Sequence, residues 1–497
     1  MGCMHFLTPQ PERVPEQALQ RAYVVGWDCV PTQSRKSWEG ELLLRLERTI
    51  DESGNLHIPW RVAGHGEVLL STASLMERER PYHLPVELAR GTLNRLRSKA
   101  DLWRMAGLKL SEQLTAQIRS AVTSFQRAAT LQQDAQAAAV AAEETIRISL
   151  DAMQQLVVEY ASQVLEFRHQ TTSPLGTLLT GNLGQELISP NSEPMFGAAF
   201  NAAVVPFSWR KIQPAVDQWD WTLCDKQIQF CGRHGLKVFG GPLLQLDRDV
   251  MPDWVLPHAE DYERLARYVR QFVAAAVERY RGRVHLWHAA AGINKPGTMP
   301  LPEEQAMQLG VLAVETTRRL DPRTPLFVSL DQPWGEYLAF TDADLPPMHF
   351  ADTLVRADLG IAGLGLEINL GYWPGGSLPR DVLEISELVD QWSLLGLPLI
   401  LLLTLPSSHS EDPLARPDAG RPLTACLAEE LTPQVHKAWV ERLLSVLLAK
   451  QSVHALVWNQ VFDAFPHKYA HAGLFNAQGQ PKPSLGVLLA LRRAHLE

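Results

Sequence analysis

Short runs of alternating apolar and polar residues, separated by turn residues, fill the first 85 positions. They lie at 22–30, 41–50, 55–60 and 67–75, and the DESGN cluster at 51–55 separates two of them. Four strands in so short a span predict a small β-sandwich or open sheet over residues 1–85. A carbohydrate-binding module and a structural cap both fit this pattern. Its candidate platform aromatics are Trp27, Trp38 and Trp60.

The pattern changes to helical spacing over residues 86–170. Neither glycine nor proline occurs between Ser111 and Gln170, and the stretch around 133–160 is rich in alanine. An unbroken helix of that length would be about 90 Å long, so a helical hairpin or a coiled coil is expected. An apolar stripe follows helical spacing at Leu150, Met153, Leu156, Val157 and Tyr160. The stripe predicts packing on the rest of the chain or self-association into a homo-oligomer.

Residues 171–497 alternate between apolar runs of strand length and helix-compatible segments. Eight such repeats predict a (β/α)₈ barrel, whose functional face is formed by the C-terminal ends of the strands. An open doubly wound sheet would need a glycine-rich phosphate loop, and GNLG at 181–184 is too short for one. The predicted strands lie at 177–182, 202–206, 236–240, 283–290, 325–331, 361–366, 398–404 and 453–458.

Composition and charge narrow the classes of function. Of the 497 residues, 46% are hydrophobic and 20% charged, as in globular proteins. The formal net charge of −9 argues against a nucleic-acid partner, because such a protein needs a basic face. No apolar run is long enough to cross a membrane, so no membrane partner is expected.

The five cysteines are scattered through the chain, which is typical of a reducing compartment. Since no secretory signal is visible at the N-terminus, a cytoplasmic location is expected. No cluster has metal-ligand spacing, and no cofactor is predicted. His285 and His288, on a predicted strand, are interpreted as structural.

Several motifs resemble glycoside hydrolase family 10, the endo-xylanase family. The stretch from Phe207 to Leu244 is similar to the family's second and third strands and keeps the spacing of Trp209, Pro214 and the WDW at 219–221. Further matches are MPDW at 251–254, YRGRVHLWH at 280–288, GLGLE at 363–367, LGLPL at 395–399, VW at 457–458 and LFNAQGQPKPS at 474–484. The resemblance implies a TIM barrel and a glycosidase ancestry.

The same resemblance implies that both catalytic glutamates are missing. Retaining glycosidases need two carboxyls about 5–5.5 Å apart. The family's acid/base glutamate lies five residues after its strand-four tryptophan, where this chain has Gly292. The family's nucleophile position corresponds to Leu403 or Thr404. The loss of both groups predicts an inactive relative.

Polar and aromatic residues remain at the predicted strand ends. Asp331 and Glu367, on adjacent strands, are weak candidates for a relocated acid/base pair; salt bridging at the barrel rim is the alternative. The residues expected to contact a carbohydrate are Trp209, Asn369, Tyr372, Trp373, Trp458, Asn459, Gln460 and Asp463.

Three hypotheses follow from the sequence. The first is a non-catalytic, xylanase-like barrel with a binding or scaffold role, possible ligands being carbohydrates. The second is an O-glycosyl hydrolase that acts on an oligosaccharide through Asp331 and Glu367. The third is a purely structural assembly protein. An open cleft with exposed Trp458 and Tyr372 would favour binding, whereas a cleft filled by Phe207, Leu243 and Leu403 would favour a scaffold.

Overall fold

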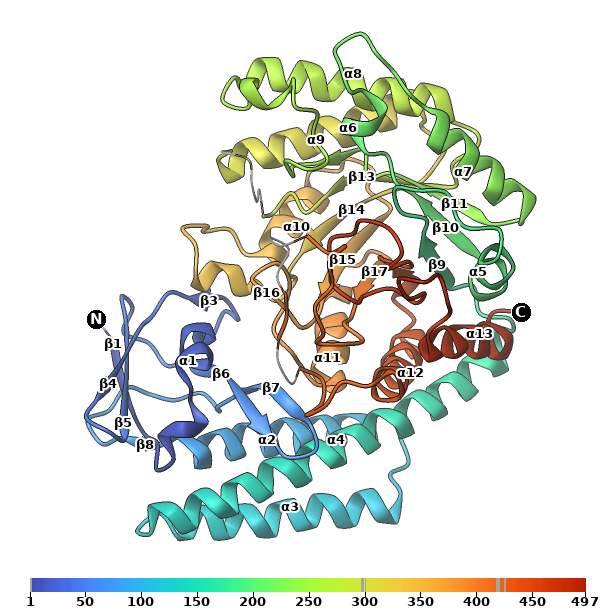
Figure 1. Ribbon diagram of the computed structural model, residues 1–497. Coiled ribbons are helices and arrows are strands. Elements are labelled where there is room, and N and C mark those ends of the chain that lie inside the picture. The colour runs from blue at the N-terminus through green and yellow to red at the C-terminus, as the bar shows by residue number, and fades with distance from the viewer. Residues whose placement is uncertain (1, 296–298, 300, 417–420, 424–425) are drawn as a thin grey trace.

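The computed structural model describes residues 2–295, 299, 301–416, 421–423 and 426–497 (Figure 1). A closed barrel of eight parallel strands forms the C-terminal part, and two β-sheets and three long helices precede it. The predicted fold class, a C-terminal barrel behind a β-rich segment and a long helical segment, is confirmed.

The N-terminal strands form two four-stranded sheets in the orders β4-β5-β1-β8 and β3-β2-β6-β7. Buried and partly exposed residues alternate along β1 and β5, so each strand presents one face to the core. The bounds are β1 Gly2–Leu7, β2 Tyr23–Val25, β3 Pro31–Thr32, β4 Arg35–Glu39, β5 Leu43–Arg48, β6 Asn55–Val62, β7 Gly66–Ser71 and β8 Tyr82–His83, with the short helix α1 at Glu16–Arg21.

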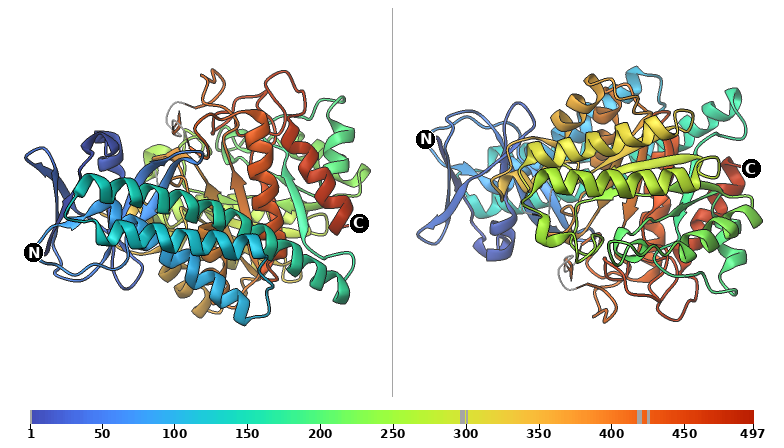
Figure 2. Two further views of the ribbon diagram at one scale, coloured as in Figure 1. Left: turned by 90° about the horizontal axis from the view of Figure 1, so that it is seen from below. Right: turned by 90° about the horizontal axis from the view of Figure 1, so that it is seen from above.

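Three long helices follow: α2 (Leu84–Met105), α3 (Glu112–Thr130) and α4 (Ala135–Thr171). They lie side by side along one flank of the molecule (Figure 2). Asp134 ends the α3–α4 turn by accepting a hydrogen bond from the Ala137 amide, which starts α4. The long glycine- and proline-free segment is therefore a helical hairpin.

The barrel closes because β19 pairs with β9 and β11 pairs with β13, all in parallel. Each of the eight strands predicted from the sequence overlaps one barrel strand. Their bounds are β9 Leu178–Asn182, β10 Ala202–Val205, β11 Lys237–Gly240, β13 Leu286–Ala291, β14 Leu326–Asp331, β15 Gly363–Asn369, β17 Leu399–Thr404 and β19 Val453–Trp458.

Helices surround the barrel (Figures 1 and 2). Their bounds are α5 Glu193–Ala199, α6 Trp209–Ile212, α7 Thr222–Arg233, α8 Tyr262–Tyr280, α9 Glu303–Leu320, α10 Pro347–Arg356, α11 Val382–Ser393, α12 Pro433–Ala449 and α13 Pro483–His495. Short strands lie in the loops at the C-terminal ends of the barrel strands. β12 (Leu244–Gln245) pairs with β13, and β16 (Tyr372–Trp373) pairs with β18 (Arg421–Pro422).

Alternate strand residues point to the barrel axis and form a separate apolar cluster inside it. This cluster contains Ala202, Val204, Phe239, Phe327, Ile400, Leu402, Ala455 and Val457. The intervening residues, such as Leu401 and Leu403 on β17, join the larger core that includes the surrounding helices. This alternation fixes which side chains reach the C-terminal mouth of the barrel.

A buried ionic network joins the N-terminal sheets to the barrel. The Arg380 guanidinium forms an ion pair with Glu336 at 2.5 Å and donates a hydrogen bond to the Tyr23 hydroxyl at 2.9 Å. Arg95 on α2 bonds to Asp381 and Glu384 at the start of α11. Removing one partner of such a buried pair leaves an uncompensated charge, so these contacts hold the two parts in one arrangement.

The apolar stripe of α4 is buried within the chain. Leu150, Met153 and Val157 are each 1% exposed. Next to them, Tyr160 stacks on Trp103 of α2, with ring centroids 4.0 Å apart. The chain's own residues therefore cover the apolar stripe, and no second copy of the chain is needed to bury it. Self-association stays a prediction, and it would have to use another surface.

We predict that Leu150→Ala lowers the free energy of unfolding by about 2–5 kcal/mol, because the truncation leaves a cavity in a close-packed interface. Val158→Ala, at a neighbouring position 44% exposed, should change it by less than about 0.5 kcal/mol. Urea unfolding at several protein concentrations measures both. A loss of stability that depends on protein concentration would show that the stripe is buried between chains instead.

Candidate functional site

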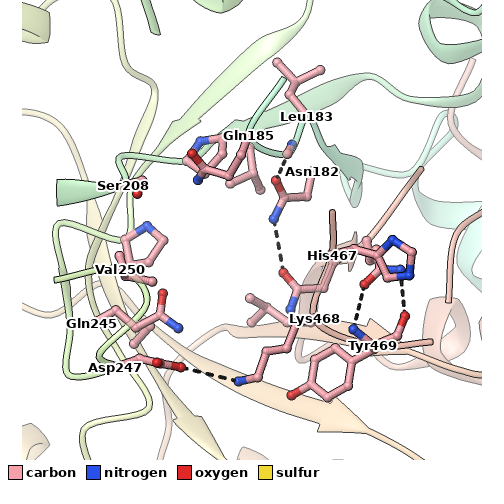
Figure 3. A pocket seen from close by; sticks show the side chains of 18 of the residues that line it. Asn182, Leu183, Gln185, Ser208, Gln245, Asp247, Val250, His467, Lys468 and Tyr469 are labelled. Carbon is pink, nitrogen blue, oxygen red and sulfur yellow. Dashed lines mark hydrogen bonds and ion pairs between the residues drawn. The ribbon is translucent and has the colours of Figure 1, made fainter. Parts of the chain in front are cut away.

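A cavity of about 430 Å³ opens at the C-terminal mouth of the barrel. Its floor is the last inward-facing apolar layer, to which Val204, Phe239, Phe327, Leu402 and Val457 contribute. Loops after several strands form the wall, as Figure 3 shows. The volume lies within the ~300–1,000 Å³ that small-molecule sites occupy.

Amide side chains line part of this wall and are held in place by one another. Asn182, at the end of β9, donates from Nδ2 to Oδ1 of Asn459 after β19, at 3.3 Å (Figure 3). The Gln460 side chain bonds both the carbonyl and the amide of Tyr469, at 2.8 and 3.0 Å. These bonds fix the rim loop from Asn459 to Tyr469 over the cavity. The mutual bonds use only part of the donor and acceptor capacity of Asn182 and Asn459.

A chain of three polar residues crosses the cavity floor from β15 to β13. The Ser329 hydroxyl on β14 donates to Oε1 of Glu367 on β15 at 2.5 Å. The Ser329 hydroxyl oxygen also lies 2.8 Å from Nε2 of His288 on β13. When the serine hydrogen goes to a Glu367 carboxylate, His288 completes the row as the Nε2–H tautomer, which donates to the serine oxygen. His288 and Glu367 both line the cavity, whereas Ser329 is fully buried between them.

Gly365 leaves space for the hydrogen-bonded row of Glu367, Ser329 and His288. Gly365 is the register partner of Ser329 in the β14–β15 pair. A Cβ atom at position 365 would lie 2.6 Å from the Ser329 Cβ. Any larger residue would push Ser329 away from the barrel axis and break its bond to Glu367.

The environment of Glu367 favours its neutral form. Burial raises the pKa of the Glu367 carboxyl to about 7, and the negative charge of Asp331 adds to the rise. The hydrogen bond from Ser329 opposes it because it stabilises the carboxylate. Burial also lowers the pKa of His288 to about 3, so this imidazole is neutral at physiological pH. Glu367 is thus a carboxyl that changes protonation near neutrality.

Lys468, in the rim loop after β19, brings a cation to the same cavity. Its Nζ lies 4.0 Å from Oδ2 of Asp247 and 5.2 Å from the centre of the Tyr469 ring (Figure 3). Tyr469 and nearby carboxylates raise the pKa of Lys468, so the amine is protonated. Asp247, which lies in the loop that follows β12, faces this ammonium.

Asp331 is the register partner of Glu367 but is engaged in a different set of contacts. Its Oδ1 accepts from the Gln332 amide at 2.9 Å and from Nδ2 of Asn369 at 3.3 Å. Its Oδ2 lies 3.9 Å from Nζ of Lys295. Asp331 is not among the described residues that line the cavity. It influences Glu367 through its charge.

The predicted aromatic contact residues are largely covered by protein. Trp458 is 2% exposed, and its indole N–H donates to the Ala472 carbonyl at 3.0 Å. Trp209 stacks on Phe272, and Tyr372 is fully buried with its hydroxyl on the Ala470 carbonyl. Trp373 packs its edge against Phe340 near the N-terminal sheet. In this conformation these rings do not line the cavity formed by the described residues.

The predicted polar contact residues separate into two groups. Asn459 and Gln460 line the cavity. Asn369 and Asp463 are buried beside it. Asp463 is paired with the Lys482 ammonium at 2.5 Å and accepts a bond from the Gly473 amide. The structure therefore brings together Asn459, Gln460 and Glu367 of the predicted set.

The two positions that the family resemblance assigns to catalytic glutamates are also located. Gly292 follows β13 with φ = 59°, and its amide donates to the Ser329 carbonyl. On β17, Leu402 faces the cavity, Leu403 faces the helices, and Thr404 is fully buried.

Sequence reasoning missed His288, Ser329 and Lys468. The sequence predicts a structural role for His288; its ring is buried, stacks on Phe327 with ring centroids 4.2 Å apart, and lines the cavity. Strand alternation could have found Ser329, since it shares the inward face with Phe327 and Asp331. No spacing rule would have found Lys468, whose place depends on how the rim loop folds.

The described part of the chain contains no group of three or more His, Cys, Asp or Glu residues arranged to hold a metal ion. Across the same residues, no helix is both long and apolar enough to span a membrane.

A protein-family model matches part of this barrel. Residues 179–296, from β9 to just after β13, match the model of glycosyl hydrolase family 10. The resemblance inferred from the sequence motifs is thereby confirmed. The match includes β13, which carries His288, and Gly292, which follows this strand.

Solved structures with a similar barrel include family xylanases. Xylanase 10B from Thermotoga petrophila RKU-1, in complex with xylobiose, is 15% identical; the match covers 68% of this chain and 97% of that chain, with a TM-score of 0.49. Native xylanase 10B from Thermotoga maritima is 14% identical, with the same coverages and TM-score. Xylanase B from Clostridium stercorarium F9 is 17% identical, covering 63% of this chain and 96% of that chain, with a TM-score of 0.46.

We predict that Glu367→Gln stabilises the protein at pH 8 but not at pH 4.5. At pH 4.5 the carboxyl is neutral in the folded chain and half ionised in the unfolded chain, so burial costs little there; the cost of burying the charge grows as pH rises from the ordinary value of 4.5 to about 7. At ~1.4 kcal/mol per pKa unit, the gain at pH 8 is roughly 3 kcal/mol at most.

Thermal unfolding at the two pH values measures this effect. Glu186→Gln is the matched control, because Glu186 is an exposed carboxylate near the rim that pairs with Lys211. An equal change in melting temperature at both pH values for Glu367→Gln would contradict the raised pKa.

Proposed function

We propose that this barrel, which resembles glycosyl hydrolase family 10, binds a small polyhydroxylated ligand such as a sugar without hydrolysing glycosides. The observation that carries the proposal is the cavity at the strand C-terminal ends, which has a polar wall. The lack of hydrolysis is inferred from the family resemblance, which assigns the catalytic glutamates to the positions of Gly292 and of Leu403 or Thr404. The ligand class follows from the many neutral donors and acceptors in the wall.

Hydrogen bonds and an apolar floor would provide the recognition. Asn182, Gln245 and Asn459 present amides to the cavity, and Ser208 presents a hydroxyl. Such groups bond to sugar hydroxyls, while the C–H faces of a sugar pack on apolar side chains such as Phe327. The buried tryptophans give no exposed stacking surface, so binding through Trp458 or Tyr372 is not part of the proposal.

A scaffold role without a ligand receives less support. That alternative expected Phe207, Leu243 and Leu403 to fill the cleft. All three are buried, yet they are not among the described residues that line the cavity. The cavity therefore remains available.

Hydrolysis is disfavoured because it needs two carboxyls on opposite sides of one glycosidic bond. Besides Glu367, the described lining includes Asp247 and Asp249. Asp249 forms an ion pair with Arg416, and Asp247 faces Lys468 and Arg416. A second candidate function is glycoside hydrolysis through Glu367 and Asp331. The observation on its side is the Glu367 pKa of about 7, which suits a general acid, whereas Asp331 is not among the described residues that line the cavity.

We predict that xylose or xylobiose binds to the purified protein and that Asn459→Ala and Gln245→Ala each weaken binding. A lost hydrogen bond to a neutral group costs about 0.5–1.5 kcal/mol, which corresponds to roughly two- to tenfold in Kd. Isothermal titration calorimetry measures the Kd, and Gln308→Ala on α9, remote from the cavity, is the control. Binding that is unaffected by both cavity variants would place the ligand elsewhere.

We predict no release of nitrophenol from aryl xylosides or cellobiosides by the wild-type protein. Gly292→Glu combined with Thr404→Glu should not create it, because position 292 has a left-handed backbone that glutamate rarely adopts and position 404 is fully buried. Circular dichroism checks the folding of the variant. Turnover by the wild type that vanishes in Glu367→Gln would instead establish the hydrolase with relocated carboxylates.

A further inference from the structure

The cavity pairs a titratable carboxyl with a protonated lysine. We propose that it catalyses proton transfer next to a carbonyl group, interconverting a small hydroxy-aldehyde and the isomeric hydroxy-ketone, with Glu367 as the base and Lys468 as the electrophile. The proposal goes beyond ligand binding, because a sugar in its open-chain form is itself a hydroxy-carbonyl compound. It needs one carboxyl and one cation, whereas glycoside hydrolysis needs two carboxyls.

Glu367 is placed as a base would need to be. It rises from the apolar floor of the cavity, and Ser329 binds Oε1. Among the contacts of the described residues, Oε2 is the carboxylate oxygen left for a ligand. A base with a pKa near the working pH combines a useful deprotonated fraction with enough basicity to remove a C–H proton.

Lys468 supplies the positive charge that enolisation requires. Lys468 belongs to the rim loop, its ammonium extends toward Asp247 (Figure 3), and its charge acts on the Glu367 carboxyl. Asp247 and the face of the Tyr469 ring hold it in place. An ammonium in a partly enclosed site stabilises a developing oxyanion more strongly than it would in water.

The reaction balances without any other reactant. The Glu367 carboxylate takes the proton from the carbon next to the carbonyl. The C–H electron pair forms a carbon–carbon double bond, and the carbonyl π pair moves to the oxygen facing Lys468. A hydroxyl proton passes between the two substrate oxygens, and protonated Glu367 returns its proton to the neighbouring carbon. Substrate and product are isomers, so nothing is oxidised or reduced overall.

Ser329 and His288 are positioning residues for this base. Ser329 can accept from His288 Nε2–H while it donates to Glu367, so the neutral imidazole fixes the direction of the serine hydroxyl. That bond stabilises the carboxylate form of Glu367. Its loss would raise the pH at which the base becomes active without removing the base.

The test is solvent deuterium exchange followed by proton NMR, with dihydroxyacetone, D-xylose and D-glucose as probes in D₂O. We expect deuterium to enter the carbon next to the carbonyl faster than in buffer for at least one probe. Glu367→Gln should slow this exchange by about a hundredfold or more, the usual contribution of a general base. Lys468→Met should also slow it, and Glu186→Gln should leave it unchanged.

The Ser329→Ala variant distinguishes a positioning effect on Glu367 from a general loss of activity. The exchange rate should rise with pH through a midpoint near 7 in the wild type, and this midpoint should move to higher pH in the variant. Exchange no faster than buffer with all three probes, or equal exchange in wild type and Glu367→Gln, would overturn the proposal. Calorimetric binding of xylose that persists without exchange would overturn it while leaving the binding function intact.

Discussion

Closure of the eight-stranded barrel is the constraint on which the rest of the structure depends. Once β19 pairs with β9 and β11 with β13, the inward or outward direction of every strand residue is fixed. The inward positions of β10, β11, β14, β17 and β19 are apolar up to the level of the cavity floor. On β15 the same face carries Gly363 and Gly365 and then Glu367. Glu367 is therefore the first residue of β15 whose side chain enters the barrel, and it does so at the barrel mouth.

This placement lowers the stability of the folded protein, but it gives the Glu367 carboxyl a pKa near neutrality. A carboxyl at this depth loses hydration, and Asp331, one strand away, adds a repulsive charge. Ser329 and His288 compensate in part by giving the carboxylate a fixed hydrogen-bond donor. Arrangements that disfavour the charged form of a buried group are concentrated at functional sites, although structural networks also produce them. Here the group faces a cavity that also contains a lysine, which distinguishes it from the fully buried pair of Glu336 and Arg380.

The fold was predictable from local patterns, whereas much of the site was not. Apolar runs such as 398–404 predict strands because both faces of a parallel barrel strand are buried. The family motifs predicted the barrel. Glu367 was a candidate because it lies near the C-terminal end of β15, and Asn459 and Gln460 were candidates because they directly follow β19. Trp458 was expected at the surface of the site, but its N–H bonds the Ala472 carbonyl and its ring is covered. Lys468 reaches the cavity only through the fold of the rim loop, which Gln460 anchors by two bonds to Tyr469. Contacts of that kind leave no periodic pattern in the sequence and could not be predicted from it.

The central claim is that Glu367 is the working group of the cavity, and its titration tests this most directly. Carbon-13 NMR of protein labelled at the glutamate side-chain carboxyl, with Glu367→Gln used to assign the signal, would follow its chemical shift with pH. We expect a midpoint near 7 in the wild type and a higher midpoint in Ser329→Ala. A midpoint near the ordinary value of 4.5, unchanged by Ser329→Ala, would contradict it.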